Sequence, residues 1–95
     1  MSYMLSLKEI SDEMSTINNW ALEESSISKV FSFNNFKESL DFVNKAGEIA
    51  EKHNHHPDIM ISYNQVRLSL TTHYEKGLTK KDFEVAKEID DLLNN

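Results

Sequence analysis

Four histidines in this sequence could carry chemistry. His53, His55 and His56 fall within four positions, immediately before Pro57, the only proline of the chain, and His73 follows an apolar run further along. Imidazole takes up and releases protons near neutral pH, and it is a common ligand of transition metals. The histidines therefore have three interpretations: solvated surface residues, ligands of a metal ion, or a set of acid/base catalysts.

Each interpretation makes a different demand on the surrounding residues. A solvated histidine at a helix end, as His53 could be, needs only the favourable negative end of the helix dipole. A His-x-His pattern with a distant third histidine could bind zinc, copper or nickel, but adjacent His55 and His56 diverge on an extended chain, and no H-E-x-x-H pattern is present. Acid/base catalysis needs two or three imidazoles around one small ligand, so it depends on whether the fold brings His73 to the others.

Composition argues against several other classes of function. The 16 acidic and 10 basic side chains give a net charge of −6, and the basic residues form no stripe, so direct binding to DNA or RNA is not expected. The two glycines form no glycine-rich loop for a nucleotide. The chain has no cysteine, and none of its apolar runs is long enough for a membrane span or a signal peptide. We therefore expect a cytoplasmic protein.

The segment before the histidines predicts a helix and then a hairpin. Ser6 and Glu9 have the spacing of a capping box, and apolar residues follow at helical intervals. Residues 20–25 and 28–33 alternate apolar and polar side chains on either side of a serine-rich turn, which is typical of two antiparallel strands. The apolar positions of the helix are Leu7, Ile10, Met14 and Ile17, and the second strand would place Phe31 and Phe33 on one face.

A long amphipathic helix is expected to lead into the histidines. It begins after Asn35, a favourable N-cap residue, and Pro57 sets its outer limit. Because proline disfavours helical geometry in the residue before it, His56 should lie in extended or turn geometry at a helix-to-strand junction. The expected apolar face consists of Phe36, Leu40, Val43, Gly47 and Ala50, flanked by Phe42, Ala46 and Ile49.

The remainder predicts two strands and a last helix. Residues 60–73 read as strand, broken near 63–65, with Val66, Leu68 and Leu70 on one face. Gly77 supplies a turn, Thr79 is the expected cap, and Asp82 falls in the first turn of a helix whose apolar positions are Phe83, Ala86, Ile89 or Asp90, and Leu93. Residues 1–95 thus form a single α+β domain of order α-β-β-α-β-β-α, a four-stranded antiparallel sheet with three helices packed on one face.

Seven of these residues resemble the signature of a known family. Glu51, His55, His56, Pro57, Tyr63, His73 and Asp82, separated by 3, 0, 0, 5, 9 and 8 residues, are similar to the motif of the pterin-4a-carbinolamine dehydratases. The flanking "LTTH" and "GLTKKDFEVAKEID" are also similar to that family. Residues 1–50 resemble it more loosely, in the order of their elements and in the pattern "FxFxxFxxxxxFVxxxGxxAE" from Phe31 to Glu51.

The resemblance implies a reaction, a substrate and an assembly. Members are lyases that dehydrate 4a-hydroxytetrahydropterin to quinonoid dihydropterin, in the recycling of tetrahydrobiopterin, and they need no metal or cofactor. The resemblance also implies a homodimer or homotetramer that joins sheet edges and packs the long helices. Some members double as dimerization cofactors of a homeodomain transcription factor, so a protein-binding coactivator is an alternative function, as is a histidine metal-binding module.

The resemblance also implies a role for each motif residue. His55 and His73 would be the proton-transfer pair, in either order of acid and base, and His56 would hold the substrate. Glu51 could orient an imidazole, and Asp82 could do so for His73 or could instead cap its helix. Pro57 and Tyr63 would bind the substrate or support the site, but their residue types alone suggest that Pro57 ends the helix and Tyr63 packs the sheet. The family commonly has an aromatic residue two positions after the proline, where this chain has Ile59, so the pterin ring would meet an aliphatic wall.

Overall fold

The order of elements predicted from the sequence, α-β-β-α-β-β-α, is confirmed by the computed structural model, which describes residues 3–93. An additional 3-10 turn, η1, precedes the last helix. The elements are α1 (Leu7–Met14), β1 (Ala21–Leu22), β2 (Ile27–Ser32), α2 (Phe36–His53), β3 (Asp58–Ser62), β4 (Gln65–Leu70), η1 (His73–Glu75) and α3 (Lys80–Asp91).

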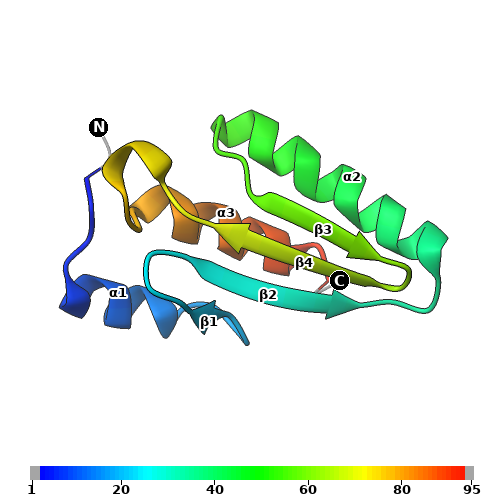
Figure 1. Ribbon diagram of the computed structural model, residues 1–95, viewed down its shortest axis with the longest axis horizontal. Coiled ribbons are helices and arrows are strands. Elements are labelled where there is room, and N and C mark those ends of the chain that lie inside the picture. Colours follow the sequence, from blue (N-terminus) through cyan, green and yellow to red (C-terminus); the bar gives the residue numbers. More distant parts are fainter. Residues whose placement is uncertain (1–2, 94–95) are drawn as a thin grey trace.

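The four strands form one antiparallel sheet in the order β1-β2-β4-β3. Strand β4 therefore lies in the interior of the sheet, while β3 forms an edge and runs alongside α2 (Figure 1). The core-facing residues of β4 are buried, as the period-two alternation predicted, and they meet apolar side chains of α2 and α3. The other face of the sheet is more polar, as is common for antiparallel sheets covered on one side.

Aromatic packing joins the sheet to α2. The rings of Phe31 and Phe33 both contact Phe42, with centroids 4.7 and 5.0 Å apart, and Trp20 meets Phe31 edge-on at 6.0 Å. The prediction that Phe31 and Phe33 share a face is therefore confirmed. These contacts place the helical layer over the middle of the sheet and leave the C-terminal end of α2 at one end of the molecule.

The buried face of α2 agrees only in part with the expected one. Phe36 and Leu40 are exposed, and Val43 and Gly47 are only half-buried. The helix is turned so that the expected flanking positions Phe42 and Ala46 are buried, together with Ser39 and with Ala50 of the expected series. An apolar strip of α2, formed by Phe36 and Leu40, is consequently left on the surface.

Two other expectations about apolar residues were wrong. Leu7 is 85% exposed, whereas Ile17 is buried but lies beyond the end of α1, so the first helix is shorter than the apolar series suggested. Leu93 is exposed and follows the end of α3.

The capping box of Ser6 and Glu9 is confirmed in both of its hydrogen bonds. Between residues 3 and 93, no helix has the length and apolar character needed to cross a membrane.

Tyr63 lies in the two-residue turn between β3 and β4. Its φ of 49° is in the left-handed region, and its side chain is 64% exposed. The expectation that this tyrosine packs the sheet was therefore wrong. The break predicted near 63–65 is real, but the chain reverses there, and a side chain at the tip of a tight turn projects away from both strands.

Candidate active site

The end of α2 determines where two histidines point. The helix ends at His53, and Asn54 then adopts a left-handed conformation with φ 50°. The backbone N–H of His55 donates to the carbonyl of Ala50 at 3.0 Å, which turns the chain back toward the core. As a result, His55 is buried and the adjacent His56 is exposed. The predicted helix-to-strand junction is confirmed, since β3 begins directly after Pro57.

His55 is paired with a buried carboxylate. Its Nε2 lies 2.6 Å from Oδ1 of Asp82, and the side chain of Asp82 is fully buried in the first turn of α3. The second oxygen, Oδ2, accepts hydrogen bonds from the hydroxyl of Thr72 at 2.8 Å and from the backbone N–H of Thr79 at 2.9 Å. Asp82 therefore both caps α3 and orients an imidazole, but that imidazole belongs to His55 and not, as the sequence suggested, to His73.

His73 begins a short closed loop next to this pair. The backbone of Thr72 pairs with Gly77 in both directions, at 3.1 and 3.4 Å, and so closes the loop of residues 73–76. His73 is exposed at the start of the loop, one residue after the threonine that contacts Asp82. The loop and the C-terminal end of α2 lie at the same end of the molecule (Figure 1). The end of α2 and the end of β4 thus meet at the carboxylate of Asp82, which lies 27 residues after His55 in the sequence.

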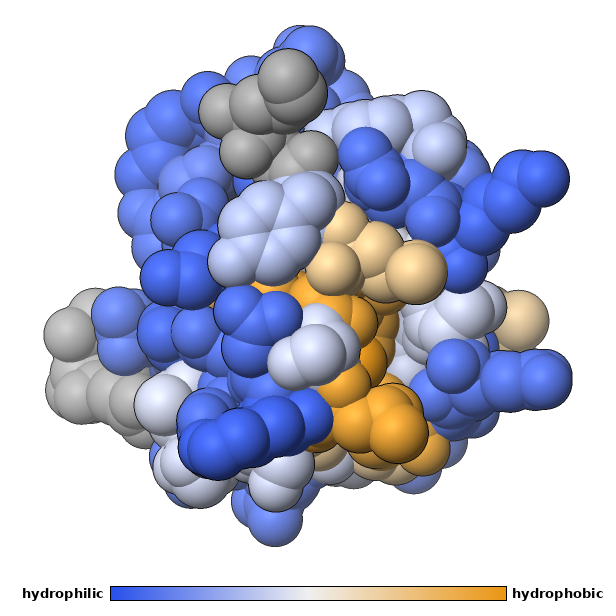
Figure 2. Space-filling view, turned by 90° about the vertical axis from the view of Figure 1, so that its left-hand side faces the viewer, coloured by the Kyte–Doolittle hydropathy of each residue, from blue (hydrophilic) through white to orange (hydrophobic). Residues whose placement is uncertain are grey.

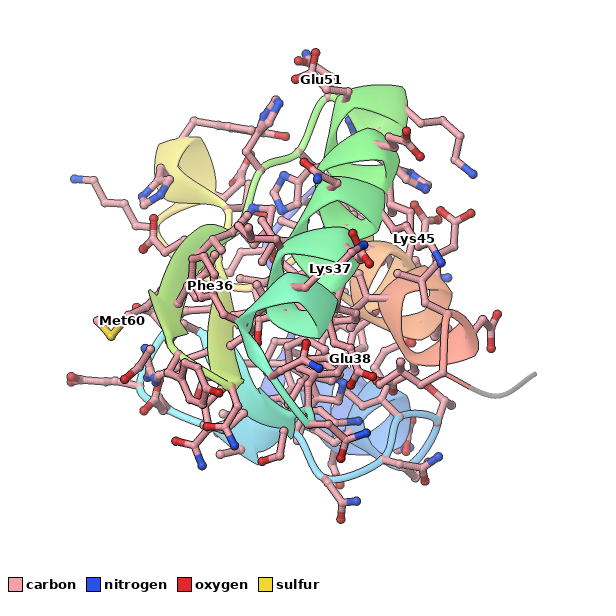
Figure 3. All side chains as sticks on the ribbon, turned by 90° about the vertical axis from the view of Figure 1, so that its right-hand side faces the viewer. Phe36, Lys37, Glu38, Lys45, Glu51 and Met60 are labelled. Atoms are coloured by element: carbon pink, nitrogen blue, oxygen red, sulfur yellow. The ribbon has the colours of Figure 1, made fainter. Side chains whose placement is uncertain are left out.

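His56 has its own acidic partner. Its Nε2 contacts Oε2 of Glu51, and both side chains are exposed. Figure 3 shows Glu51 near the C-terminal end of α2. The sequence expectation was that Glu51 orients an imidazole. The partner is His56 because His55 lies beyond the last helical turn and points inward. The carboxylates of Glu51 and Asp82 thus hold the two adjacent imidazoles in different surroundings.

His53 is turned toward α3. Its Nε2 contacts Glu88, which is also bound by Lys52, and Lys81 donates to the carbonyl of His53 at 3.1 Å. The hydrogen bond from Lys52, and then that from His53, hold the pKa of Glu88 below its ordinary value. His53 is therefore half-buried in a contact between two helices and differs in its surroundings from the other three histidines.

A shallow groove runs beside Glu51, the partner of His56. It lies between α2 and the edge strand β3 and is lined by Val43, Asn44, Gly47, Glu48, Glu51 and Ile59. Ile59 is 40% exposed. Because Glu51 both lines the groove and contacts His56, the groove extends to the histidines that follow α2.

Thr72 and Thr79, which donate to Asp82, were not recognised from the sequence as parts of the site. A signal was present, because Thr72 continues the alternation of the buried residues Val66, Leu68 and Leu70, and a hydroxyl at a core-facing position requires a partner. Within residues 3–93, no three His, Cys, Asp or Glu side chains are grouped as a metal ion would require. The arrangement that is present suits proton transfer, with one fixed imidazole and two exposed ones.

The chain matches a family model and named relatives along nearly its whole length. The sequence model of the family described as Pterin 4 alpha carbinolamine dehydratase matches residues 4–92. A Sulfurisphaera tokodaii protein provisionally named pterin-4-alpha-carbinolamine dehydratase is 47% identical over 89 residues, which cover 94% of this chain and 96% of that protein. A protein of a Picosynechococcus species with the same provisional name is 47% identical over 92 residues, covering 97% of this chain and 100% of that protein.

Solved structures show the same fold. A Brucella melitensis protein described as a transcriptional coactivator/pterin dehydratase superposes with a TM-score of 0.89 at 28% identity, covering 94% of this chain and 97% of that one. A pterin dehydratase-like protein described as a RuBisCO assembly factor of the alpha-carboxysome has a TM-score of 0.68 at 19% identity, covering 79% and 89%, and is similar in fold. From the match to the family along nearly its whole length, the chain belongs to the pterin-4a-carbinolamine dehydratase family.

Proposed function

We propose that this protein is a cytoplasmic lyase that removes water from 4a-hydroxytetrahydropterin and releases quinonoid dihydropterin, as part of tetrahydrobiopterin recycling. The family membership supports the reaction class. The observation that carries the proposal for the site is the hydrogen-bonded connection from His55 through Asp82 to Thr72, the residue that precedes His73.

The reaction requires two proton transfers. One proton is delivered to the 4a-hydroxyl group as its carbon–oxygen bond breaks and water leaves, and another is removed from N5 of the pterin as the new double bond forms. His55 and His73 are the proposed acid and base, since general acid/base groups of this kind contribute about 10² to 10⁴ in rate. Proton transfer alone completes the reaction, so no cofactor or metal takes part in the proposed mechanism.

Other motif residues have proposed supporting roles. His56, held by Glu51, would bind the substrate at the groove, and Ile59 would form an aliphatic wall for the pterin ring. Pro57 would fix the backbone between His56 and β3. Tyr63 can support the site only indirectly, because β3 separates it from Pro57 by five residues, roughly 16 Å of extended chain.

The proposal is tested by measuring dehydration of 4a-hydroxytetrahydropterin by the purified protein. His55→Ala and His73→Ala should each lower kcat by about 10² to 10⁴. His53→Ala is the matched control, because His53 contacts Glu88 and lies outside the proposed pair. Circular dichroism would verify that each variant folds. Wild-type rates in both folded variants would refute the proposed mechanism, and an inactive wild-type protein would refute the function.

We further propose that the active protein is a homodimer or homotetramer. The apolar strip of α2, with Phe36 and Leu40, is exposed, and so is Met60 on the edge strand β3. Figure 3 shows Met60 on the side of the sheet that faces away from α2. Exposed apolar residues beside a free strand edge support association between copies, since edges of this kind pair readily.

Protein binding is a second candidate function. The Brucella melitensis relative is described as a coactivator as well as a dehydratase. In addition, the end of this molecule that carries the 73–76 loop has an apolar hollow surrounded by polar residues (Figure 2), lined in part by Met4, Leu5, Leu7, Ile10 and Leu78. Co-purification with a transcription factor that survives His55→Ala and His73→Ala would support this role, and a homo-oligomer that captures no such factor would contradict it.

A further inference from the structure

Thr72 occupies an unusual position in the fold. It follows β4 on the core-facing side, its side chain is fully buried, and its hydroxyl oxygen lies 2.8 Å from Oδ2 of Asp82 and 2.9 Å from the hydroxyl oxygen of Thr79. A buried hydroxyl with two partners in a packed core specifies one arrangement of hydrogen bonds. The chemistry of the three groups determines which atom is the donor in each bond.

The carboxylate of Asp82 can only accept. The Thr72 hydroxyl, the Thr79 backbone N–H and Nε2 of His55 must then all be donors to it. Thr72 has a single hydroxyl proton, which it gives to Asp82. The hydroxyl of Thr79 must therefore donate to the oxygen of Thr72. A directed chain runs from Thr79 through Thr72 to Asp82.

This chain determines which nitrogen of His55 exchanges protons. Because Nε2 keeps its hydrogen for Asp82, only Nδ1 can accept a proton from the substrate or release one to it. Nδ1 has no hydrogen-bond partner among residues 3–93, and no fully buried side-chain nitrogen or oxygen in this part of the chain lacks a partner. Nδ1 therefore reaches the surface of the protein.

The main chain of Thr72 positions the other member of the pair. Its N–H donates to the carbonyl of Gly77, and its carbonyl accepts from the N–H groups of Glu75 and Gly77. These bonds close the loop that begins with His73. One residue thus contacts the carboxylate that orients His55 and also anchors the segment that carries His73.

We propose that Thr72 is a positioning residue for both proton-transfer groups. Its hydroxyl stabilises the Asp82 orientation that keeps His55 protonated on Nε2, so that proton exchange with substrate takes place at Nδ1. Its backbone holds the loop of His73. This inference rests on the proposed dehydratase function, but its main consequence, the position of the proton on His55, can be measured without any substrate.

The first test compares Thr72→Val, which has a similar shape but no hydroxyl, with Thr72→Ser, which keeps the hydroxyl. In Thr72→Val, kcat should fall by about tenfold or more while KM stays within about threefold, because alignment and not binding is lost. Thr72→Ser should restore kcat to within about threefold of wild type. Thr71→Val is the control, since the Thr71 hydroxyl bonds to the carbonyl of Ser25 and not to Asp82.

The second test uses ¹⁵N NMR of the His55 ring, assigned by comparison with His55→Ala. Wild type should show the Nε2–H tautomer when neutral. In Asp82→Asn, the donors Thr72 and Thr79 hold the amide oxygen on their side, so the amide nitrogen faces His55 and donates to Nε2. This nearly isosteric variant should therefore shift His55 to the Nδ1–H tautomer, and Thr72→Val should lower the Nε2–H population.

Two outcomes would overturn the inference. One is a folded Thr72→Val protein with wild-type kcat and an unchanged His55 tautomer. The other is an Asp82→Asn protein in which His55 keeps its hydrogen on Nε2, and this measurement decides the question if Thr72→Val does not fold. A wild-type protein without dehydratase activity would refute the proposed function, whereas the tautomer measurements would still test the role of Thr72.

Discussion

The three motif histidines differ mainly in how firmly each ring is held. His55 is buried against Asp82, whereas His56 contacts the exposed Glu51 and His73 is exposed at the start of its loop. A buried imidazole bonded to a fixed carboxylate loses little freedom when the substrate arrives, and exposed rings can adjust to it. This division fits a site in which one proton-transfer group is rigid and the other comes from a loop.

Ile59 allows the substrate-binding side of the proposal to be tested at a single residue. Ile59→Trp should lower KM for the pterin by roughly two- to tenfold, because stacking of aromatic rings adds about 0.5–1.5 kcal/mol, and kcat should change little. Steady-state kinetics would measure both constants. Val30→Trp is the control, since Val30 is exposed on the other face of the sheet, on strand β2. Equal changes in the two variants, or none in Ile59→Trp, would contradict the proposed location of the pterin ring.

At the scale of elements, the two ends of α2 determine where the site residues lie. The side chain of Asn35 accepts from the N–H of Glu38 at 2.9 Å and so caps the start of the helix. At the other end, Glu88 of α3 binds Lys52 and His53 immediately before the segment with His55 and His56. Both ends can be weakened separately by substitution.

Loss of the N-cap should affect stability and not chemistry. Asn35→Ala should lower the free energy of unfolding by about 1 kcal/mol, because the N–H groups of the first turn lose an acceptor. Urea denaturation would measure this change, with Asn44→Ala on the exposed side of the same helix as control. A loss in Asn44→Ala as large as that in Asn35→Ala would show that the cap is not its cause.

The contact between α2 and α3 should make stability depend on pH. Because the pKa of Glu88 is lowered in the folded protein, its contacts stabilise the fold above the ordinary pKa of glutamate, about 4.3, and this contribution is lost as pH falls through the lowered value. Glu88→Gln should therefore be less stable than wild type at about neutral pH. The two proteins should be equally stable below the lowered pKa of Glu88.

Thermal unfolding across pH would measure the effect of Glu88→Gln. The control is Glu84→Gln, because Glu84 is exposed on the same helix. The expected difference is small, since Glu88 is about one-third exposed and solvent screens its charge. A difference between wild type and Glu88→Gln that grows toward acid pH would have the wrong sign and would contradict the assignment.

At the scale of the whole molecule, the exposed apolar strip of α2 predicts self-association. Light scattering should give a mass two or four times that of the 11.0 kDa chain. Leu40→Glu should reduce this mass, because a charge placed in an apolar interface must be desolvated. Lys37→Glu, an exposed position on the same helix, is the control. A monomeric wild-type protein would refute the proposed assembly.

Local sequence patterns were sufficient to predict the elements and their order. The caps at Ser6 and Asn35, the alternation of Val66, Leu68 and Leu70, and the end of α2 before Pro57 each depend on residues a few positions apart. Such patterns act through backbone hydrogen bonds and side-chain periods that are the same in any fold. The sequence motif also named both members of the His55–Asp82 pair, but not the two threonines that donate to Asp82.

The tertiary structure alone decided which partners these residues have. It selected which row of α2 is buried, it exposed Tyr63 at a turn, and it paired Asp82 with His55 while leaving His73 to the adjacent loop. The buried row of α2 and the His55–Asp82 pair depend on how α2 and α3 pack with the rest of the fold. That packing is made by side chains of different elements, such as Phe42 on Phe31, which no local period encodes.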